Sequence, residues 1–340
     1  MQNMKPNNIP KIEYIDADTL LSMPMARTPF LIPGLLPRGT HLLCGAPKTG
    51  KSWLALWLGL QVARGGEIWG ESTEPHGVLY LCLEDTQERV RDRLYKLTDT
   101  APEGLHIATA CDTIGRGFEE QLNNYLLLNS DTKLVILDTL QKIRPSRGEG
   151  ANVYGADYAD ISALKALADD FGVTLLILHH LRKREDGADP FNMVSGSTGL
   201  TGAVDGTYLL RRERGDDCAE LLITGRDVQY QSLRLRFRDF VWTLEERLSE
   251  EEIVRERLPD VLFDICEFMR GREMWSGTPT ELCEALGTST APNAITKILG
   301  RYSEDFLNAA RIGFTTCKTR GLRQIGLYKL PPPITDDSPF

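Results

Sequence analysis

The stretch Gly45-Ala46-Pro47-Lys48-Thr49-Gly50-Lys51-Ser52 follows the apolar run 42–44 and precedes Trp53 and the glycine-free apolar run 54–58. An apolar strand, a glycine-bearing loop and a helix in this order predict a phosphate-binding loop. The glycines let backbone N–H groups converge on phosphate oxygens at a helix N-terminus. Lys51 then reaches the β- and γ-phosphates, and the Ser52 hydroxyl binds Mg²⁺. We therefore predict that residues 45–53 bind a nucleoside triphosphate with Mg²⁺.

Composition limits the class of protein. The chain has 340 residues, of which 41% are apolar and 26% charged, which is typical of one large globular domain plus a smaller one. Apolar runs such as 173–178 are far shorter than the roughly 20 residues that span a bilayer, and the N-terminus has no apolar signal region. The seven cysteines form no C-x-x-C pair, so reduced thiols are expected. We expect a cytoplasmic protein without a membrane segment.

Continuous apolar runs at 78–83, 134–137 and 173–178 predict strands buried on both faces of a parallel sheet. The amphipathic stretch 158–170 is the expected crossover helix between the last two. Strands that alternate with helices predict an α/β domain of three layers. After Asp205 the short alternating runs at 207–211, 220–224 and 232–237 predict an antiparallel extension that ends near Trp242.

Acidic residues at strand ends indicate hydrolytic chemistry. Asp138 ends an apolar run, where a carboxylate can bind the metal's water shell; capping a following helix is the alternative. The next residue is Thr139, so no glutamate directly follows this aspartate. Glu84 ends the preceding strand and can accept a proton from water in line with the γ-phosphate. Asp85 competes with it, and we expect one of the two to cap the helix that begins near Thr86.

Five motifs in order resemble the RecA-like ATPase core, and within it the hexameric RepA-type helicase family, related to DnaB and KaiC. They are GAPKTGKSWLAL, YLCLED, LVILDTL, LILHHLRK and SGSTGLTGAVDG, and the resemblance covers roughly residues 28–245. It implies ATP as the nucleotide, Mg²⁺ as the metal and self-association as a ring, expected to be a hexamer.

The resemblance also assigns roles to residues beyond the phosphate loop. His180 first, and His179 second, would sense the γ-phosphate, the alternative being a core histidine satisfied by the backbone. Arg226 would be an arginine finger that acts on the neighbouring subunit's nucleotide, the alternative being a surface arginine paired with Asp227. Asp205 could cap the adjacent strand or tune the histidines.

Two polar segments are candidates for single-stranded DNA contact. They are 144–157, with Arg144, Arg147 and Tyr154, and 181–195, with Arg182, Lys183 and Arg184. In RecA-like rings the loops at these places line the central channel. Several copies of a modest basic cluster could therefore track phosphates even though each chain carries a net charge of −9. Solvated loops with incidental charges are the alternative.

The C-terminal part resembles a winged-helix module. Helices are expected at 261–269, from Thr278 or Thr280 to 286, and after Pro292, followed by two strands around 319–321. Arg320 and Arg323 lie in a basic stretch suited to a phosphate backbone, although such modules also bind proteins. The expected division is an arm at 1–27, an ATPase domain at 28–245, a linker at 246–258, a winged-helix-like domain at 259–330 and a disordered tail at 331–340.

These observations predict an ATP-hydrolysing, Mg²⁺-dependent hexameric DNA helicase or DNA-dependent motor. It would act in replication or recombination, on a mobile element. One rival is an oligomeric ATPase that regulates or loads partner proteins without unwinding. The other is a DNA-binding replication accessory.

Overall fold

The computed structural model describes residues 14–23, 28–145, 153–181, 189–196, 198–319 and 322–331. The chain forms two compact units, 1–249 and 250–340. The boundary between them falls within the segment expected to be a linker; the other expected boundaries stay predictions. The acidic stretch at this point is the end of strand β13 (Val241–Ser249) followed by helix α8 (Glu250–Arg257).

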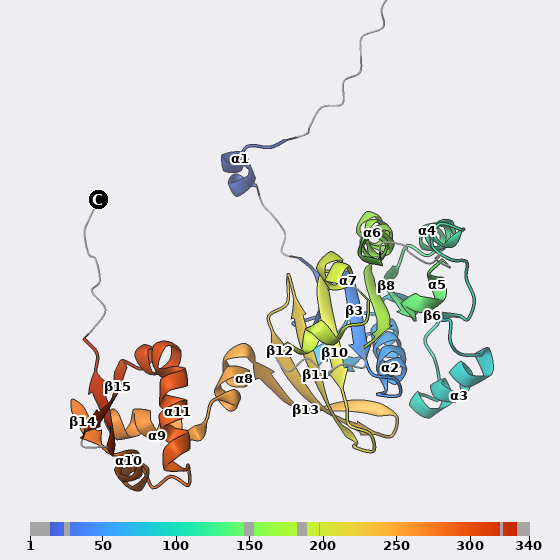
Figure 1. The fold of residues 1–340 in the computed structure, drawn as a ribbon. Helices are drawn as coiled ribbons and strands as arrows, with labels where there is room; N and C mark the ends of the chain where they lie inside the picture. Colours follow the sequence, from blue (N-terminus) through green and yellow to red (C-terminus); the bar gives the residue numbers. More distant parts are fainter. Residues whose placement is uncertain are drawn as a thin grey trace, which may run out of the picture. The chain divides into compact units, whose positions relative to one another are not determined.

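A nine-stranded sheet is the centre of the larger unit, in the order β13-β12-β11-β10-β3-β9-β8-β6-β7 (Figure 1). The six strands from β10 to β7 are parallel, and an antiparallel extension is added beyond β10. The sequence predicted this extension, but the expected run 207–211 is itself parallel to β3, and the extension does not end near Trp242 because β13 continues it to Ser249. The parallel strands are β3 (Gly39–Gly45), β6 (Gly77–Cys82), β7 (Leu105–Ala108), β8 (Thr132–Asp138), β9 (Thr174–His180) and β10 (Gly206–Arg211). The extension contains β11 (Cys218–Gly225), β12 (Gln231–Arg238) and β13.

Helices cover both faces of this sheet, because alternate strand residues point to opposite sides. Leu43 packs in the core beneath α2 (Lys51–Arg64) and α3 (Gln87–Leu97), whereas Leu42 packs in the core beneath α4 (Phe118–Leu128) and α6 (Val153–Phe171). The sheet between these two helical layers confirms the three-layer α/β class. Short elements complete the unit: α1 (Ala17–Ser22), β1 (Phe30–Ile32), β2 (Leu36–Pro37), β4 (Glu67–Ile68), β5 (Glu71–Ser72), α5 (Leu140–Ile143), η1 (Pro190–Met193) and α7 (Thr198–Ala203).

The smaller unit packs helices against a three-stranded antiparallel sheet of order β14-β16-β15 around its own apolar core. Its elements are α9 (Asp260–Met269), β14 (Met274–Gly277), α10 (Pro279–Leu286), α11 (Pro292–Tyr302), η2 (Ser303–Leu307), β15 (Ile312–Thr319) and β16 (Leu322–Lys329). Thr278, rather than Thr280, caps α10, in a reciprocal capping box with Glu281. The helices and the hairpin lie where the sequence predicts them, β14 was not foreseen, and the winged-helix assignment stays a prediction.

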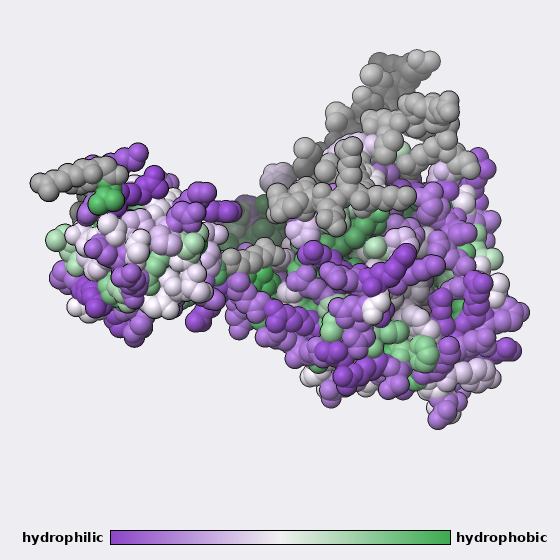
Figure 2. Space-filling model, turned by 60° about the horizontal axis from the view of Figure 1, so that its bottom comes forward, coloured by the Kyte–Doolittle hydropathy of each residue, from purple (hydrophilic) through white to green (hydrophobic). Residues whose placement is uncertain are grey.

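Polar side chains dominate the surface in the view of Figure 2, with smaller apolar patches between them. Among the helices that the structure describes, none combines the length and apolarity needed to cross a bilayer.

Candidate nucleotide-binding site

The predicted phosphate loop joins β3 to α2 at the carboxyl edge of the parallel strands. Every residue of β3 is buried, and α2 begins at Lys51 immediately after the loop. Gly50 caps the helix in a left-handed conformation with φ +99, and a Cβ there would lie 2.9 Å from the indole of Trp242. Only glycine suits both the backbone and the space, so the loop is held tightly against the helix N-terminus, where its N–H groups can bind an anion.

Lys51 lies inside this loop. Its ammonium donates hydrogen bonds to the carbonyls of Gly45 and Ala46, at 2.7 and 2.9 Å. Burial lowers the pKa of Lys51, while the negative charges of Asp138 and Glu84 act in the opposite direction. The next residue, Ser52, hydrogen-bonds to Asp138, and Thr139, which follows Asp138, hydrogen-bonds to Glu84. The structure therefore brings this cation and the two predicted catalytic carboxylates into one site.

Asp138 is the buried carboxylate of the site, with an exposed fraction of 3%. The phenol of Tyr80 donates a 2.8 Å hydrogen bond to its Oδ2, and the Ser52 hydroxyl also hydrogen-bonds to it. Burial raises the pKa of Asp138, and the two hydroxyl donors oppose that effect. A hydroxyl beside a carboxylate is an oxygen donor set that fits Mg²⁺. Thr139, not Asp138, occupies the N-cap position of α5, so the alternative that Asp138 is a helix cap is wrong.

The structure separates the two neighbouring acids after β6. The Thr139 hydroxyl donates to Glu84 Oε1 at 3.1 Å, which places Glu84 beside the end of β8. Asp85 instead forms ion pairs with Arg93 at 2.6 Å and Arg89 at 3.6 Å. The expectation that one acid caps α3 is wrong, because the Thr86 side chain accepts the hydrogen bond from the first turn. Glu84 is therefore better placed as a base, and that role stays a prediction.

The two histidines have different surroundings at the end of β9. Parallel pairing sets His180 opposite Gly45, the first residue of the phosphate loop. His179 points into the core with an exposed fraction of 4%, and its Nε2 donates to the Ser195 carbonyl at 2.9 Å. Burial lowers the pKa of His179 to about 4, so it is neutral at pH 7. His179 fits the core-histidine alternative, and His180 remains the candidate for sensing the γ-phosphate.

Arg226 lies far from the phosphate loop of its own chain. It follows Gly225, which pairs with Gly206, and Gly206 pairs with His41 near the start of β3. The loop begins at the other end of β3, about four residues or ~13 Å farther along the strand. Arg226 is 63% exposed and lies 3.6 Å from Asp205. Arg226 is therefore out of reach of its own phosphate loop, and its role as an arginine finger on a neighbouring chain stays a prediction.

Asp205 binds the amino-terminal end of β3, at the opposite end of that strand from the phosphate loop. Its carboxylate accepts the Thr40 N–H at 3.0 Å and pairs with Lys165. Burial opposes ionisation, but the Lys165 and Thr40 hydrogen bonds prevail and the pKa of Asp205 is lowered. The strand-capping alternative for Asp205 therefore has direct support. Asp227, the alternative partner of Arg226, accepts instead from the Thr28 hydroxyl at 3.0 Å.

The structure describes only some of the residues that the sequence suggested for DNA contact. Arg147, Arg182, Lys183, Arg184 and Arg320 lie outside the described residues, whereas Arg323 is exposed on β16. Arg144 is only 11% exposed and pairs with Asp157 and Asp160 of α6. The interpretation of Arg144 as a DNA-contacting side chain is wrong, because a guanidinium buried between two carboxylates does not face a strand.

An aromatic surface lies beside the phosphate loop, and of its residues only Trp53 was named from the sequence. The rings of Trp53 and Phe240 lie 4.9 Å apart, and the Lys96 ammonium lies 4.4 Å from the Phe240 centroid. Trp53 is in the first turn of α2, so this surface adjoins the expected phosphate position. The aromatic density of 237–242 was the available signal, but its partner Trp53 is distant in sequence.

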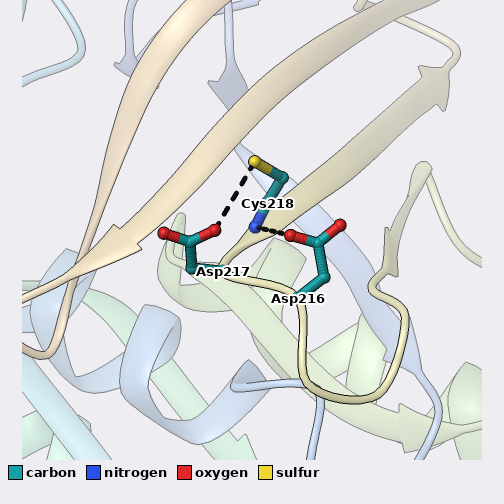
Figure 3. Close-up of side chains that lie close together, drawn as sticks. All are labelled: Asp216, Asp217 and Cys218. Carbon is teal, nitrogen blue, oxygen red and sulfur yellow. Dashed lines mark hydrogen bonds between the residues drawn. The ribbon is translucent and has the colours of Figure 1, made fainter.

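Asp216, Asp217 and Cys218 gather their side-chain donors in the β10–β11 connection (Figure 3). Each group is already engaged within the chain. The Cys218 N–H donates to Asp216 at 2.9 Å, its thiol lies 3.8 Å from Asp217, and Arg236 lies 3.3 Å from Asp217. We assign no metal to this exposed cluster.

Residues 8–186 match a protein-family model described as AAA domain, and this is more than half of the chain. The matched range contains the phosphate loop, Glu84, Asp138 and both histidines. The chain belongs to the AAA domain family.

Solved structures show the same fold for this AAA domain protein. One is an ATPase domain that is 16% identical, with a TM-score of 0.50, and the match covers 62% of this chain and 85% of that one. A DnaB-like replicative helicase, determined with its interactions with primase, is 16% identical, also with a TM-score of 0.50. That match covers 61% of this chain and 57% of the helicase. The RecA-like P-loop ATPase fold is thus established.

Proposed function

We propose that this AAA domain protein is a Mg²⁺-dependent ATPase that works as a ring, expected to be a hexamer, and moves on or unwinds DNA. The observation that carries the proposal is the position of the two sets of catalytic groups. Lys51, Ser52, Asp138 and Glu84 converge at one edge of the sheet, and Arg226 lies toward the other edge. Such a division suits an active site completed by a second subunit.

At the nucleotide, the backbone of the phosphate loop binds phosphate oxygens and Lys51 moves from the loop carbonyls to the β- and γ-phosphates. Ser52 and Asp138 would hold Mg²⁺, which would neutralise charge on the phosphates. Glu84, fixed by Thr139, orients the attacking water and accepts its proton. His180, which pairs opposite Gly45, senses whether the γ-phosphate is present. Trp53 and Phe240 offer a flat surface for the base.

Contact with single-stranded DNA is assigned to Arg182, Lys183 and Arg184, which follow His180 in the sequence. Proximity in the chain lets the nucleotide state reach these side chains through a few residues of backbone. The DnaB-like replicative helicase among the similar structures supports replication or recombination as the process. We further propose that the process is the replication or recombination of a mobile element and that the protein is cytoplasmic.

The smaller unit is proposed to be a winged-helix-like module that contacts DNA through its hairpin, where Arg323 is exposed. One observation favours a second function, the loading or regulation of partner proteins. A cavity of about 1000 Å³ opens between α9 and the strands β15 and β16, with the apolar Phe263 and Met269 beside the charged Arg270 and Lys329. Protein interfaces combine an apolar core with a polar rim, and this lining carries both kinds of side chain.

ATP hydrolysis measured with and without single-stranded DNA tests the proposal. We expect turnover that requires Mg²⁺, increases with single-stranded DNA and disappears in Lys51→Ala. Turnover that ignores DNA at every salt concentration would favour the ring ATPase that acts on proteins. Absence of any nucleotide hydrolysis, with nucleotide binding intact, would contradict the proposed enzyme itself.

A further inference from the structure

Arg144, directly after α5, is a cation with a side chain only 11% exposed that lies between two carboxylates of α6. Its guanidinium lies 2.9 Å from Asp157 and 3.3 Å from Asp160, and these aspartate side chains are 1% and 9% exposed. Breaking a buried ion pair is costly because the remaining charge is left without compensation. The cluster of Arg144, Asp157 and Asp160 therefore fixes the end of α5 to the first two turns of α6.

The same cluster contacts the segment that follows β9. Gly196 has φ +97, and a Cβ at this position would lie 2.9 Å from the Asp157 carboxylate, so the Gly196 backbone packs directly on the ion pair. The preceding residue, Ser195, accepts from His179 at 2.9 Å and donates its N–H to the His180 carbonyl at 3.0 Å. A short series of contacts thus joins Asp157 to the end of β9.

The cluster also lies at the borders of both segments that the sequence assigned to DNA. Arg144 and Asp157 flank residues 146–152 in the chain. On the other side, Leu181 pairs with Val194 in an antiparallel bridge that flanks residues 182–188. One ion cluster therefore borders the two segments and the candidate γ-phosphate sensor together.

We propose that Arg144 is a positioning residue that makes the start of α6, the backbone at 195–196 and the end of β9 move as one body. The inference rests on the proposed function, in which His180 responds to nucleotide and the residues that follow it bind single-stranded DNA. A shift at His180 passes through Ser195 to Gly196, whose contact with α6 depends on Arg144 holding Asp157 in place by the ion pair. The same ion pairs join α6 to the border of 146–152. Arg144 itself touches neither nucleotide nor DNA.

Hydrogen exchange on the full chain, without DNA, tests directly whether Arg144 couples these elements. In the wild type, a non-hydrolysable ATP analogue with Mg²⁺ should slow exchange in both 153–162 and 189–196. In Arg144→Gln the analogue should still slow 189–196, which adjoins His180, but should no longer slow 153–162. Equal slowing of both peptides in a folded Arg144→Gln protein would overturn the inference.

Stimulation of ATP hydrolysis by single-stranded DNA provides the functional readout. Arg144→Gln should keep basal turnover and lose about tenfold in stimulation, a typical coupling effect. Arg144→Lys, which keeps the charge but not two directed contacts, should retain part of it. The control is Arg247→Gln, which breaks an ion pair with Glu71 of 3.1 Å elsewhere in the same unit and should keep full stimulation. Full stimulation in Arg144→Gln would contradict the positioning role.

The two failures are distinguishable. A wild-type enzyme that DNA does not stimulate would refute the proposed function. The exchange experiment would still show whether Arg144 couples α6 to the end of β9. If circular dichroism shows that Arg144→Gln is unfolded, Arg144→Lys and Asp157→Asn decide it by the same two readouts. Uncoupled exchange in either folded variant supports the inference, and coupled exchange in both contradicts it.

Discussion

The phenol of Tyr80 donates a 2.8 Å hydrogen bond to the carboxylate of Asp138, and both side chains are buried. Tyr80 is on β6 and Asp138 ends β8, the adjacent strand, so the sheet itself holds the donor against the acceptor. The Ser52 hydroxyl also hydrogen-bonds to this carboxylate. The bond from Tyr80 therefore helps to hold the predicted metal ligand in one fixed direction.

Removing this phenol should weaken the metal site without emptying the nucleotide site. Partners that orient a metal ligand typically contribute 10- to 100-fold in metal affinity. Tyr80→Phe should therefore raise the Mg²⁺ concentration needed for half-maximal ATP hydrolysis by about tenfold, while nucleotide binding changes little. A Mg²⁺ titration of turnover measures this, and an unchanged midpoint would show that Asp138 needs no such support.

Glu84→Gln should retain ATP binding and reduce turnover by about 10²- to 10⁴-fold, the usual contribution of a general base. The matched control is Asp85→Asn, because Asp85 is engaged by Arg93 and Arg89 rather than by Thr139. We expect this control to hydrolyse ATP at a rate much closer to the wild type. If Asp85→Asn were the inactive variant and Glu84→Gln the active one, the assignment would be reversed.

If Arg226 acts on the nucleotide of a neighbouring chain, as we propose, two inactive variants should complement each other. Arg226→Ala retains the phosphate loop, and Lys51→Ala retains the arginine. Mixed rings contain some interfaces with both groups intact, and ATPase activity should partly return. The rate measured across mixing ratios gives the answer. No recovery in verified mixed rings would exclude action between subunits.

His179 should make stability depend on pH. Burial lowers its pKa from 6.5 to about 4, so the unfolded chain binds the proton first as the pH falls. Its stabilising contribution is complete above pH 6.5 and is lost as the pH falls towards 4. At most about 3 kcal/mol is at stake. His179→Gln should therefore show a smaller loss of unfolding free energy between these pH values in urea titrations; an equal loss would contradict the buried neutral histidine.

The sequence was sufficient where chemistry is local. The phosphate loop and Asp138 were predictable because a strand, a turn and a few residue types specify each of them. Glu84 and Asp85 could not be fully separated from the sequence, since both follow the same strand. The structure distinguishes them by long-range contacts, Glu84 with Thr139 and Asp85 with Arg93.

Arg144 was misassigned for a related reason. Its partners Asp157 and Asp160 are 13 and 16 positions farther along the chain, and both reach Arg144 because they lie on α6, which packs beside it. The contact of Phe240 with Trp53 likewise depends on the β12–β13 hairpin returning to α2. Burial and long-range pairing of this kind are set by the packed fold, which a pattern of residue types does not contain.

Strand displacement from a forked DNA duplex tests the central claim most directly. The full chain, ATP and Mg²⁺ should release the labelled strand, and Glu84→Gln and Lys51→Ala should both fail to do so. A wild-type protein that hydrolyses ATP and assembles into rings, yet leaves the fork paired under all salt conditions, would contradict the helicase.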